Sequence, residues 1–444
     1  MRRSPWRFLL ISPDIRNRLL ISLAILVIYR LAAHMPVPGV DRASIAQILN
    51  TAGSGATLFN MLDLLSGGTV SNFSVLAMGV YPYITAQIIL QVITPIIPAL
   101  QRRMEEDPRE GRKWMEKWTY YLAVPMAALN AFGQIRLFQQ YAGGNEILTS
   151  PLGFNIPTIT MILAMTAGTM FAIWLGELIS EYGIRNQGLS LIIFAGIVAR
   201  IPANFGRVLT DQQQRVPLII FLIFLTVITI FAIVYVQEGR RHVPVMYPGR
   251  RVGNRMSMPV KGTLPLMVNM AGMIPLIFAQ SLLTLPAVVA QFFINSANET
   301  VVKIAAGIQN TFGGGNSWYW ILYFVMVVGF TFFYTDVIFA QQNYGENLKR
   351  AGAQIPGVTK GAPTQRYLTR VLRRITFPGA VFLGIVAIMP FLVGLIWPTL
   401  GSGSSTLLVT SAGLLIVVGV VRDVYRSIEA ELKLRGYDQA VLVH

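Results

Sequence analysis

The sequence predicts an all-α polytopic membrane protein, with ten transmembrane helices in two inverted, pseudo-symmetric halves. Three observations predict this class: an apolar composition, ten apolar segments separated by basic loops, and one motif that occurs twice. Of the 444 residues, 54% are hydrophobic and only 13% are charged, whereas a soluble domain carries about 25% charged residues. This composition excludes an ordinary soluble enzyme and a disordered chain.

Ten apolar segments are long enough to cross a bilayer, because about 20 helical residues span its hydrocarbon core. The first of them resembles a signal peptide, but the segments that follow favour a retained helix. The spans are expected at about 18–35, 73–97, 117–138, 155–177, 187–204, 215–237, 264–291, 318–341, 375–397 and 404–423.

The basic residues alternate between the two sides of these spans. Lys and Arg number 36 against 20 acidic residues, a net charge of +16. Of the 36, 29 fall in the N-terminus, the C-terminal tail and the loops after even-numbered spans. Because cytoplasmic segments of membrane proteins are rich in Lys and Arg, both termini are expected in the cytoplasm.

Two of the basic loops, about 238–263 and about 342–374, are longer than the topology requires. Both contain Pro-Gly pairs, Pro248-Gly249 and Pro356-Gly357, which indicate defined turns. Two interpretations remain open for their charges. They form prongs that bind an acidic or RNA-containing partner, or they only set the orientation in the membrane.

The motif G-x-x-P-x-I-x-A-Q occurs at 79–87 and again at 272–280. The two copies lie five spans apart, and because five is odd the second copy runs in the opposite direction. This indicates an inverted repeat, with halves at 1–210 and 211–444. Chance similarity between apolar helices is the alternative. The motif prolines are expected to kink two helices that face each other.

Catalytic chemistry has little support in the sequence. There is no cysteine, and the three histidines lie far apart, so no metal site, cofactor or enzymatic activity is expected. The middles of the spans are nearly free of ionisable groups, which argues against a cage for a charged solute. Aliphatic residues of the repeated motif, such as Ile84 and Ile277, either form a water-excluding seal or simply pack.

Several motifs together resemble the SecY family of protein-translocation channels, over nearly the whole chain. They are GVYPYITAQIILQ at 79–91, LPLMVNMAGMIP at 264–275, WLGE at 174–177 and ELKLRGY at 431–437. The resemblance implies ten spans in two inverted halves, in the bacterial cytoplasmic membrane. It also implies a passive pore subunit of the general secretion translocon, which passes unfolded polypeptides across the membrane and sideways into it. The implied partners are the SecE and SecG subunits, the SecA motor, the ribosome, preprotein signal sequences and lipid.

The resemblance also assigns roles to individual residues. The pore ring would be Ile84, Ile88, Leu189, Ile193, Ile277 and Ile416. The plug would be Phe59, Asn60, Met61, Leu62, Asp63, Leu64, Leu65, Ser66, Gly67 and Gly68. The lateral gate would carry Gln87, Gln91, Asn269 and Gln280. Partner docking would use Arg240, Arg241, Arg250, Arg251, Arg255, Lys349, Arg350, Thr359, Lys360 and Arg366.

One departure from the family pattern lies in the second basic loop. The family usually has Arg-Pro where this chain has Thr359-Lys360. Thr359 therefore stands in place of the arginine, and the lysine follows it. Lysine supplies charge but not the planar fork of a guanidinium, so the contact made by that arginine is in doubt. Two other functions remain open: a secondary transporter with inverted repeats for a small apolar solute, and a non-conducting scaffold. The long basic loops and the lack of midplane charge favour the channel.

Overall fold

The computed structural model describes residues 13–40, 73–141, 155–210, 215–248, 251–252, 255–256, 260–291, 293, 298–313, 316–342, 344–396 and 411–434. Most of them are helical. The helices are α2 (Pro13–Ala32), α5 (Tyr81–Ile96), α6 (Pro98–Glu106), α7 (Pro108–Tyr141), α8 (Ile156–Tyr182), α9 (Gly188–Thr210), α10 (Arg215–Glu238), α11 (Ile274–Gln291), α12 (Glu299–Phe312), α13 (Ser317–Gln342), α14 (Tyr344–Arg350), α15 (Ala362–Ile396) and α17 (Ser411–Leu434). The strands are β1 (Arg240–Tyr247), β2 (Arg251–Val252), β3 (Arg255–Met256) and β4 (Val260–Met267).

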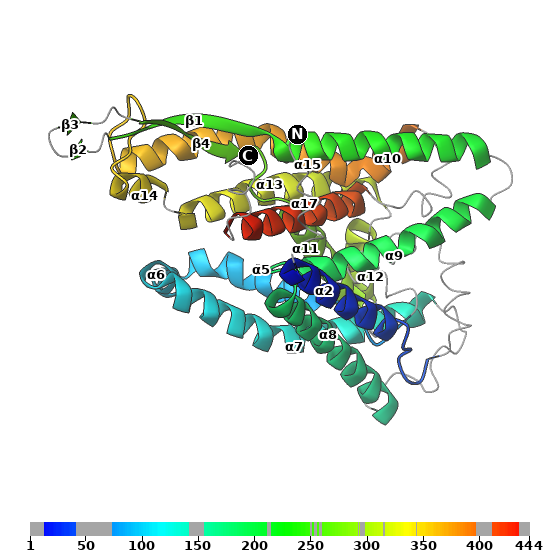
Figure 1. Ribbon diagram of the computed structural model, residues 1–444. Coiled ribbons are helices and arrows are strands. Elements are labelled where there is room, and N and C mark those ends of the chain that lie inside the picture. The colour runs from blue at the N-terminus through cyan, green and yellow to red at the C-terminus, as the bar shows by residue number, and fades with distance from the viewer. Residues whose placement is uncertain are drawn as a thin grey trace.

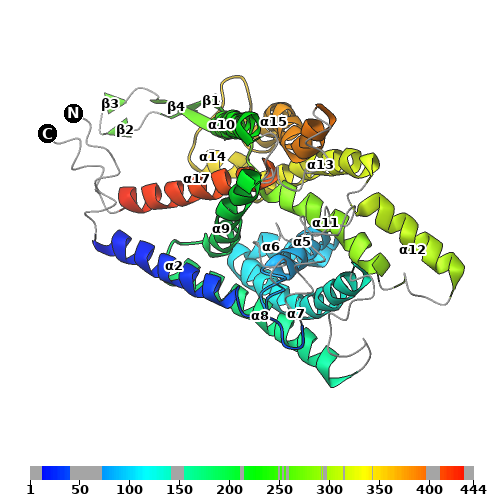
Figure 2. The same cartoon turned by 90° about the vertical axis from the view of Figure 1, so that its right-hand side faces the viewer.

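The helices lie in two groups with a shared middle. In both views, α2, α6, α7 and α8 lie on one side, and α10, α13 and α15 lie on the other (Figures 1 and 2). Helices α9, α11 and α17 lie between the two groups. One apolar cluster of buried residues joins both groups, from Tyr29 on α2 to Leu383 on α15.

Each of the ten expected spans overlaps a helix within the described residues. Among those residues, the helices that begin at Ile156, Ser317 and Ala362 are long and apolar enough to cross a membrane. Shorter apolar stretches lie in α9, α10 and α11. Apolar residues also cover much of the outer surface, such as Phe231 and Tyr235 on α10, as expected for a protein surrounded by lipid.

The seventh expected span, 264–291, was wrong at its beginning, because residues 260–267 form strand β4 and the helix begins only at Ile274. Strand β4 pairs antiparallel with β1 in a hairpin that extends from the end of α10 (Figure 1). In β1 the buried residues Val243 and Val245 alternate with exposed ones, which is the period of a strand with one covered face. Likewise, residues 73–80 precede α5 as turns rather than as helix.

The expected kinks at the motif prolines were also wrong. Pro82 is the second residue of α5, and Pro275 is the second residue of α11. A proline in the first turn of a helix removes no hydrogen bond, because the first four N–H groups have no partner inside the helix. The motif therefore marks the start of each helix. The proline inside α11 is instead Pro286.

Candidate gate, pore and docking surface

The two copies of the repeated motif adopt the same backbone. Gly79 and Gly272 both have positive φ, 51° and 65°, and in each copy the helix begins two residues later. Only glycine takes this left-handed conformation without a steric cost, so the motif glycine permits the turn. Glycine and proline are therefore spaced as a helix-start signal, which explains why the two residues recur together.

Helices α5 and α11, which follow these turns, are in direct contact. The Tyr81 hydroxyl of α5 donates a hydrogen bond to the carbonyl oxygen of Ser281 in α11, at 3.3 Å. Both Tyr81 and Ser281 are buried. The expectation that the two motif helices face each other is therefore confirmed. The tyrosine was missed in the sequence because its partner is a backbone oxygen 200 residues away.

The six residues expected to form the pore ring come from four helices. Five of them, all except Ile88, belong to or pack against the single large apolar cluster: Ile84, Leu189, Ile193, Ile277 and Ile416. They lie on α5, α9, α11 and α17. Ile88 is buried but lies outside that cluster. Aliphatic side chains offer no polar partner to water or an ion, so these six residues fit a seal.

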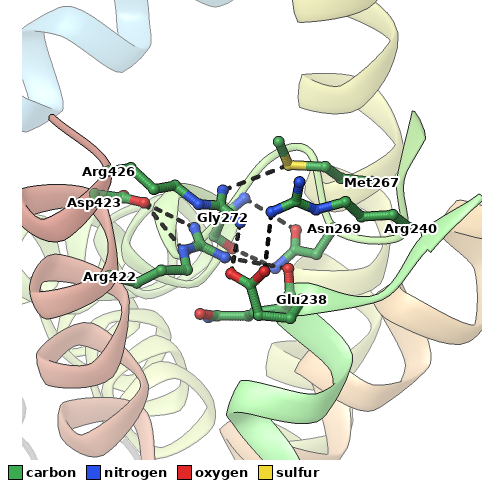
Figure 3. Close-up of polar contacts among 9 residues, drawn as sticks. Glu238, Arg240, Met267, Asn269, Gly272, Arg422, Asp423 and Arg426 are labelled. Atoms are coloured by element: carbon green, nitrogen blue, oxygen red, sulfur yellow. Dashed lines mark hydrogen bonds and ion pairs between the residues drawn. The ribbon is translucent and has the colours of Figure 1, made fainter. Parts of the chain in front are cut away.

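The four polar residues expected at the gate differ in their burial and contacts. Gln87 and Gln91 are half-buried on α5, and Gln280 is buried on α11. Asn269 precedes α11 and is only 2% exposed. Its Oδ1 accepts from the Gly272 N–H at 2.9 Å, and its Nδ2 donates to the Gly272 carbonyl at 3.0 Å. Its amide is thus used within its own turn, as Figure 3 shows.

The predicted plug, 59–68, lies outside the described residues, as does Arg250.

The predicted docking residues lie on the β1–β4 hairpin or on the segment from α14 to α15. Arg240 and Arg241 begin β1, while Arg251 and Arg255 lie in the short strands β2 and β3. Lys349 and Arg350 end α14, and Arg366 lies in the first turns of α15. Thr359 and Lys360 are exposed on the loop between α14 and α15.

The two long basic loops form one folded unit rather than two separate prongs. Met246 of β1 exchanges two backbone hydrogen bonds with Gln354, at 2.8 and 2.9 Å. Beneath this bridge lies a second apolar core that joins both loops to α13 and α15: Val243, Val245, Leu266, Phe339, Leu348, Ala353, Ile355, Leu368 and Leu372. Both loops thus belong to one folded unit. We refer to residues 240–267 and 344–374 together as the hairpin unit.

Ion pairs fasten the base of the hairpin unit to α17. The carboxylate of Glu238, the last residue of α10, pairs with Arg426 at 2.6 Å and with Arg240 at 3.0 Å (Figure 3). Arg422 of α17 reaches the backbone oxygen of Gln237 at 3.5 Å. Burial raises the pKa of the Glu238 carboxyl, but the charges and hydrogen bonds of Arg426 and Arg240 outweigh it, so the pKa is lowered. Glu238 therefore stays ionised near neutral pH.

Within the described residues, no group of three or more His, Cys, Asp or Glu side chains could hold a metal ion. The site that the structure describes is a contact between two helices beside an aliphatic cluster. A basic folded unit is attached at one end of it.

Comparison with known proteins gives a consistent family. The SecY family model matches residues 74–425. A curated relative from Streptomyces galbus, named protein translocase subunit SecY, is 36% identical over 437 residues, covering 96% of this chain and 97% of the relative. One of the same name from Aquifex aeolicus (strain VF5) is 38% identical, with the same coverage. A solved structure described as a protein conducting channel superposes with a TM-score of 0.63 at 18% identity, covering 97% of each chain.

Proposed function

Because this chain belongs to the SecY family, we propose that it is the central pore-forming subunit of a protein translocase in the bacterial cytoplasmic membrane. It passes unfolded polypeptides across the membrane and releases apolar helices sideways into it. The observation that carries this proposal is the convergence of aliphatic side chains from four helices beside the contact between α5 and α11. A small-solute transporter has no support among the relatives, which are named protein translocase subunits.

The resting channel is closed by the apolar ring, because a narrow aliphatic constriction excludes water and ions. A signal sequence enters between α5 and α11, separates them, and so opens both the ring and a path to lipid. Residues 59–68 form the plug of this channel. Gln87, Gln91 and Gln280 are the polar groups that the moving chain meets at the gate, while Asn269 holds the turn from which α11 starts.

The chain crosses the membrane ten times, in halves 1–210 and 211–444 that run in opposite directions, with both termini in the cytoplasm. The common backbone of the two motif copies supports the inverted repeat. Ion pairs support the orientation, because Glu431 of α17 pairs with Arg18 at 2.7 Å and with Arg185 at 3.7 Å. These three residues come from segments that the distribution of charge assigns to the same side.

The hairpin unit binds partners, and its charges do more than set orientation. Both loops fold onto one core, so one folded unit carries the basic residues that recruit an acidic or RNA-containing partner. The partners are the SecE and SecG subunits, the SecA motor and the ribosome. The chain is not an enzyme and carries no nucleotide-binding motif, so motor or ribosome supplies the driving force.

The test is reconstitution of the chain with SecE and SecA from the same source in liposomes. We expect ATP-dependent protection of a signal-bearing preprotein from added protease. Lys360→Glu in the hairpin unit is expected to lower the initial rate about tenfold at limiting SecA, because charge steers association. Saturating SecA should restore the rate.

The matched control is Lys303→Glu on α12, which is exposed and lies outside the hairpin unit. This substitution should leave the initial rate within about twofold of the rate of the unmodified chain, because salt screens a surface charge that lies far from the docking site. Absence of protection in the unmodified chain, together with uptake of a small apolar solute, would refute the channel. Equal effects of the two substitutions would refute docking while leaving the channel intact.

A further inference from the structure

A cavity of about 930 Å³ lies between α13, α14 and α15, outside the gate and the pore ring. Its walls combine cationic and aromatic side chains. The residues that matter for its chemistry are Arg366, Arg370, Arg373 and Arg374 of α15, together with Phe332 of α13 and Phe377 of α15. Because positions 366, 370 and 373 are four and three residues apart, three of these arginines share one face of the helix.

One of the four arginines is neutralised by a fixed partner. The guanidinium of Arg373 donates two hydrogen bonds to the carboxylate of Asp336 on α13. Its Nη2 lies 2.8 Å from Oδ2, and its Nε lies 3.3 Å from Oδ1. This fork ties α13 to α15 and fixes the shape of the cavity. The acidic residue of the cavity wall, Glu346, is paired with Arg350 at 3.5 Å.

The other three arginines, Arg366, Arg370 and Arg374, make no ion pair or hydrogen bond with any residue that the structure describes, and all three are exposed. They therefore leave an uncompensated positive field at the cavity. Guanidinium groups match the oxygens of a phosphate or a carboxylate, because two parallel N–H donors bind two oxygens at once.

The position along α15 places these arginines at a membrane surface. Both α13 and α15 belong to stretches long and apolar enough to cross a bilayer. The arginines precede the apolar stretch of α15, which begins at Ile375. Phe377, one turn beyond Arg373, is 60% exposed, and Phe332 is half-buried across the cavity. The cavity thus changes from cationic to aromatic where the basic part of α15 gives way to its apolar part, as a side chain near a membrane surface would require.

We propose that this cavity is a binding site for an anionic phospholipid. The lipid phosphate lies among Arg366, Arg370 and Arg374, and its acyl chains lie against Phe332 and Phe377. A free phosphate would use the arginines but not the phenylalanines, and a zwitterionic lipid would bring its own cation into the positive field. An anionic lipid matches both ends of the cavity, which is why the site selects it.

The experiment is native mass spectrometry of the full chain with SecE in detergent, titrated with phosphatidylglycerol or phosphatidylcholine. The test variant is Arg370→Gln with Arg374→Gln. Both residues lie in the hairpin unit, but the sample contains neither SecA nor the ribosome, so the titration reports lipid binding alone. The matched variant, Lys113→Gln with Lys117→Gln on α7, removes the same charge elsewhere. Each arginine beside an anionic lipid is worth roughly fivefold in affinity, so the test variant should bind phosphatidylglycerol about 25-fold more weakly.

The matched variant should stay within about twofold of the unmodified chain for phosphatidylglycerol, since its lysines lie outside the cavity. Inorganic phosphate and glycerol 3-phosphate, at the same concentrations, should not displace the lipid. Equal losses in the two variants, equal binding of phosphatidylcholine, or displacement by glycerol 3-phosphate would each overturn the proposal.

A second variant keeps the test decisive if the glutamines disturb folding. Arg370→Lys with Arg374→Lys keeps the charge and loses only the fork, so affinity for phosphatidylglycerol should fall by about threefold at most. A loss as large as that of the glutamine variant would show that the side chains act through packing and not through charge, which also overturns the proposal.

Discussion

The starts of α5 and α11 have the same backbone conformation and differ in the contacts that hold them in place. Each follows a glycine with positive φ and has proline as its second residue. Backbone contacts hold both starts, more tightly at α5 than at α11, and the turn before α11 is closed by a side chain as well. The comparison shows how a repeated motif can give one helix start that is tightly wedged and one whose turn also depends on a side chain.

The turn before α5 is wedged between two segments. Val75 N–H bonds to the carbonyl of Met35 at 3.0 Å, and Val37 N–H bonds to that of Phe73 at 3.2 Å. On the other side, α8 comes so close that a Cβ at Gly168 would lie 2.1 Å from the Val75 carbonyl oxygen. Such contacts leave the start of α5 little room to move.

The turn before α11 is packed less tightly than the turn before α5. A Cβ at Gly379 of α15 would lie 2.9 Å from the Val268 carbonyl oxygen, and the Val268 N–H bonds to the carbonyl of Gly239 at 2.9 Å. A Cβ at Gly272 would meet nothing closer than an Arg422 nitrogen at 3.9 Å. The turn is closed by the Asn269 amide and continues directly from β4 of the hairpin unit. The start of α11 is therefore connected to the proposed docking surface. We infer that a partner bound there acts on α11 more directly than on α5.

The largest effect is expected from Gly168→Ala. The added methyl would overlap the Val75 backbone, so α8 or the turn must shift, at a cost of about 3 kcal/mol, as for an overpacked core. The measurement is the apparent free energy of unfolding of the purified chain in mixed micelles. Gly329→Ala on α13 is the control, because a Cβ there meets nothing within 4 Å, and it should stabilise by up to about 1 kcal/mol. Equal stability of the two variants would contradict the wedge at α5.

A smaller loss is expected from Asn269→Ala. It leaves the Gly272 N–H and carbonyl without their partner in a buried turn, which costs about 2 kcal/mol. The same assay measures it. Asn130→Ala is the control. It removes one hydrogen bond, from the Asn130 amide to the Met126 carbonyl, and that carbonyl lies inside a helix, where it keeps its backbone partner. The control should therefore cost about half as much. A loss at Asn269 no larger than at Asn130 would mean that the turn is held by its backbone alone.

Each apolar run that the sequence predicted as a span overlaps a helix, whereas the segments between these runs were predicted less well. Apolar runs of about 20 residues have a strong signal, because the bilayer requires both length and composition. The hairpin was missed because Leu264 and Leu266 alternate over too few residues before an apolar helix, so the run was assigned to the helix. The prolines were misinterpreted for a related reason. Pro82 and Pro275 lie inside apolar runs, and the runs do not show where a helix starts.

The sequence named residues of the candidate site where the proposed role depends on residue type, and it missed contacts that depend on backbone partners. Aliphatic positions such as Ile277 and Ile416 could be assigned by resemblance, and the structure brings them into one cluster. The bridge from Met246 to Gln354 could not be predicted, because both partners are backbone atoms more than 100 residues apart. The pairing of Glu238 with Arg426 likewise requires the helices to be placed first.

The smallest effect on stability, and the one that addresses the gate directly, is expected from Tyr81→Phe. Tyr81 of the first copy corresponds to Ile274 of the second, so this hydrogen bond has no counterpart in the repeat. At 3.3 Å the bond is long, and its loss should cost no more than about 1 kcal/mol of stability.

Because the bond joins the two helices of the proposed gate, it must break when they separate. Its loss should therefore raise translocation of a preprotein with a weakened signal sequence about threefold, while a preprotein with a strong signal is unaffected. Ser281→Ala is the control, since it leaves the carbonyl acceptor in place. If the two variants behave alike in the protease-protection assay, the hydroxyl of Tyr81 does not hold the gate.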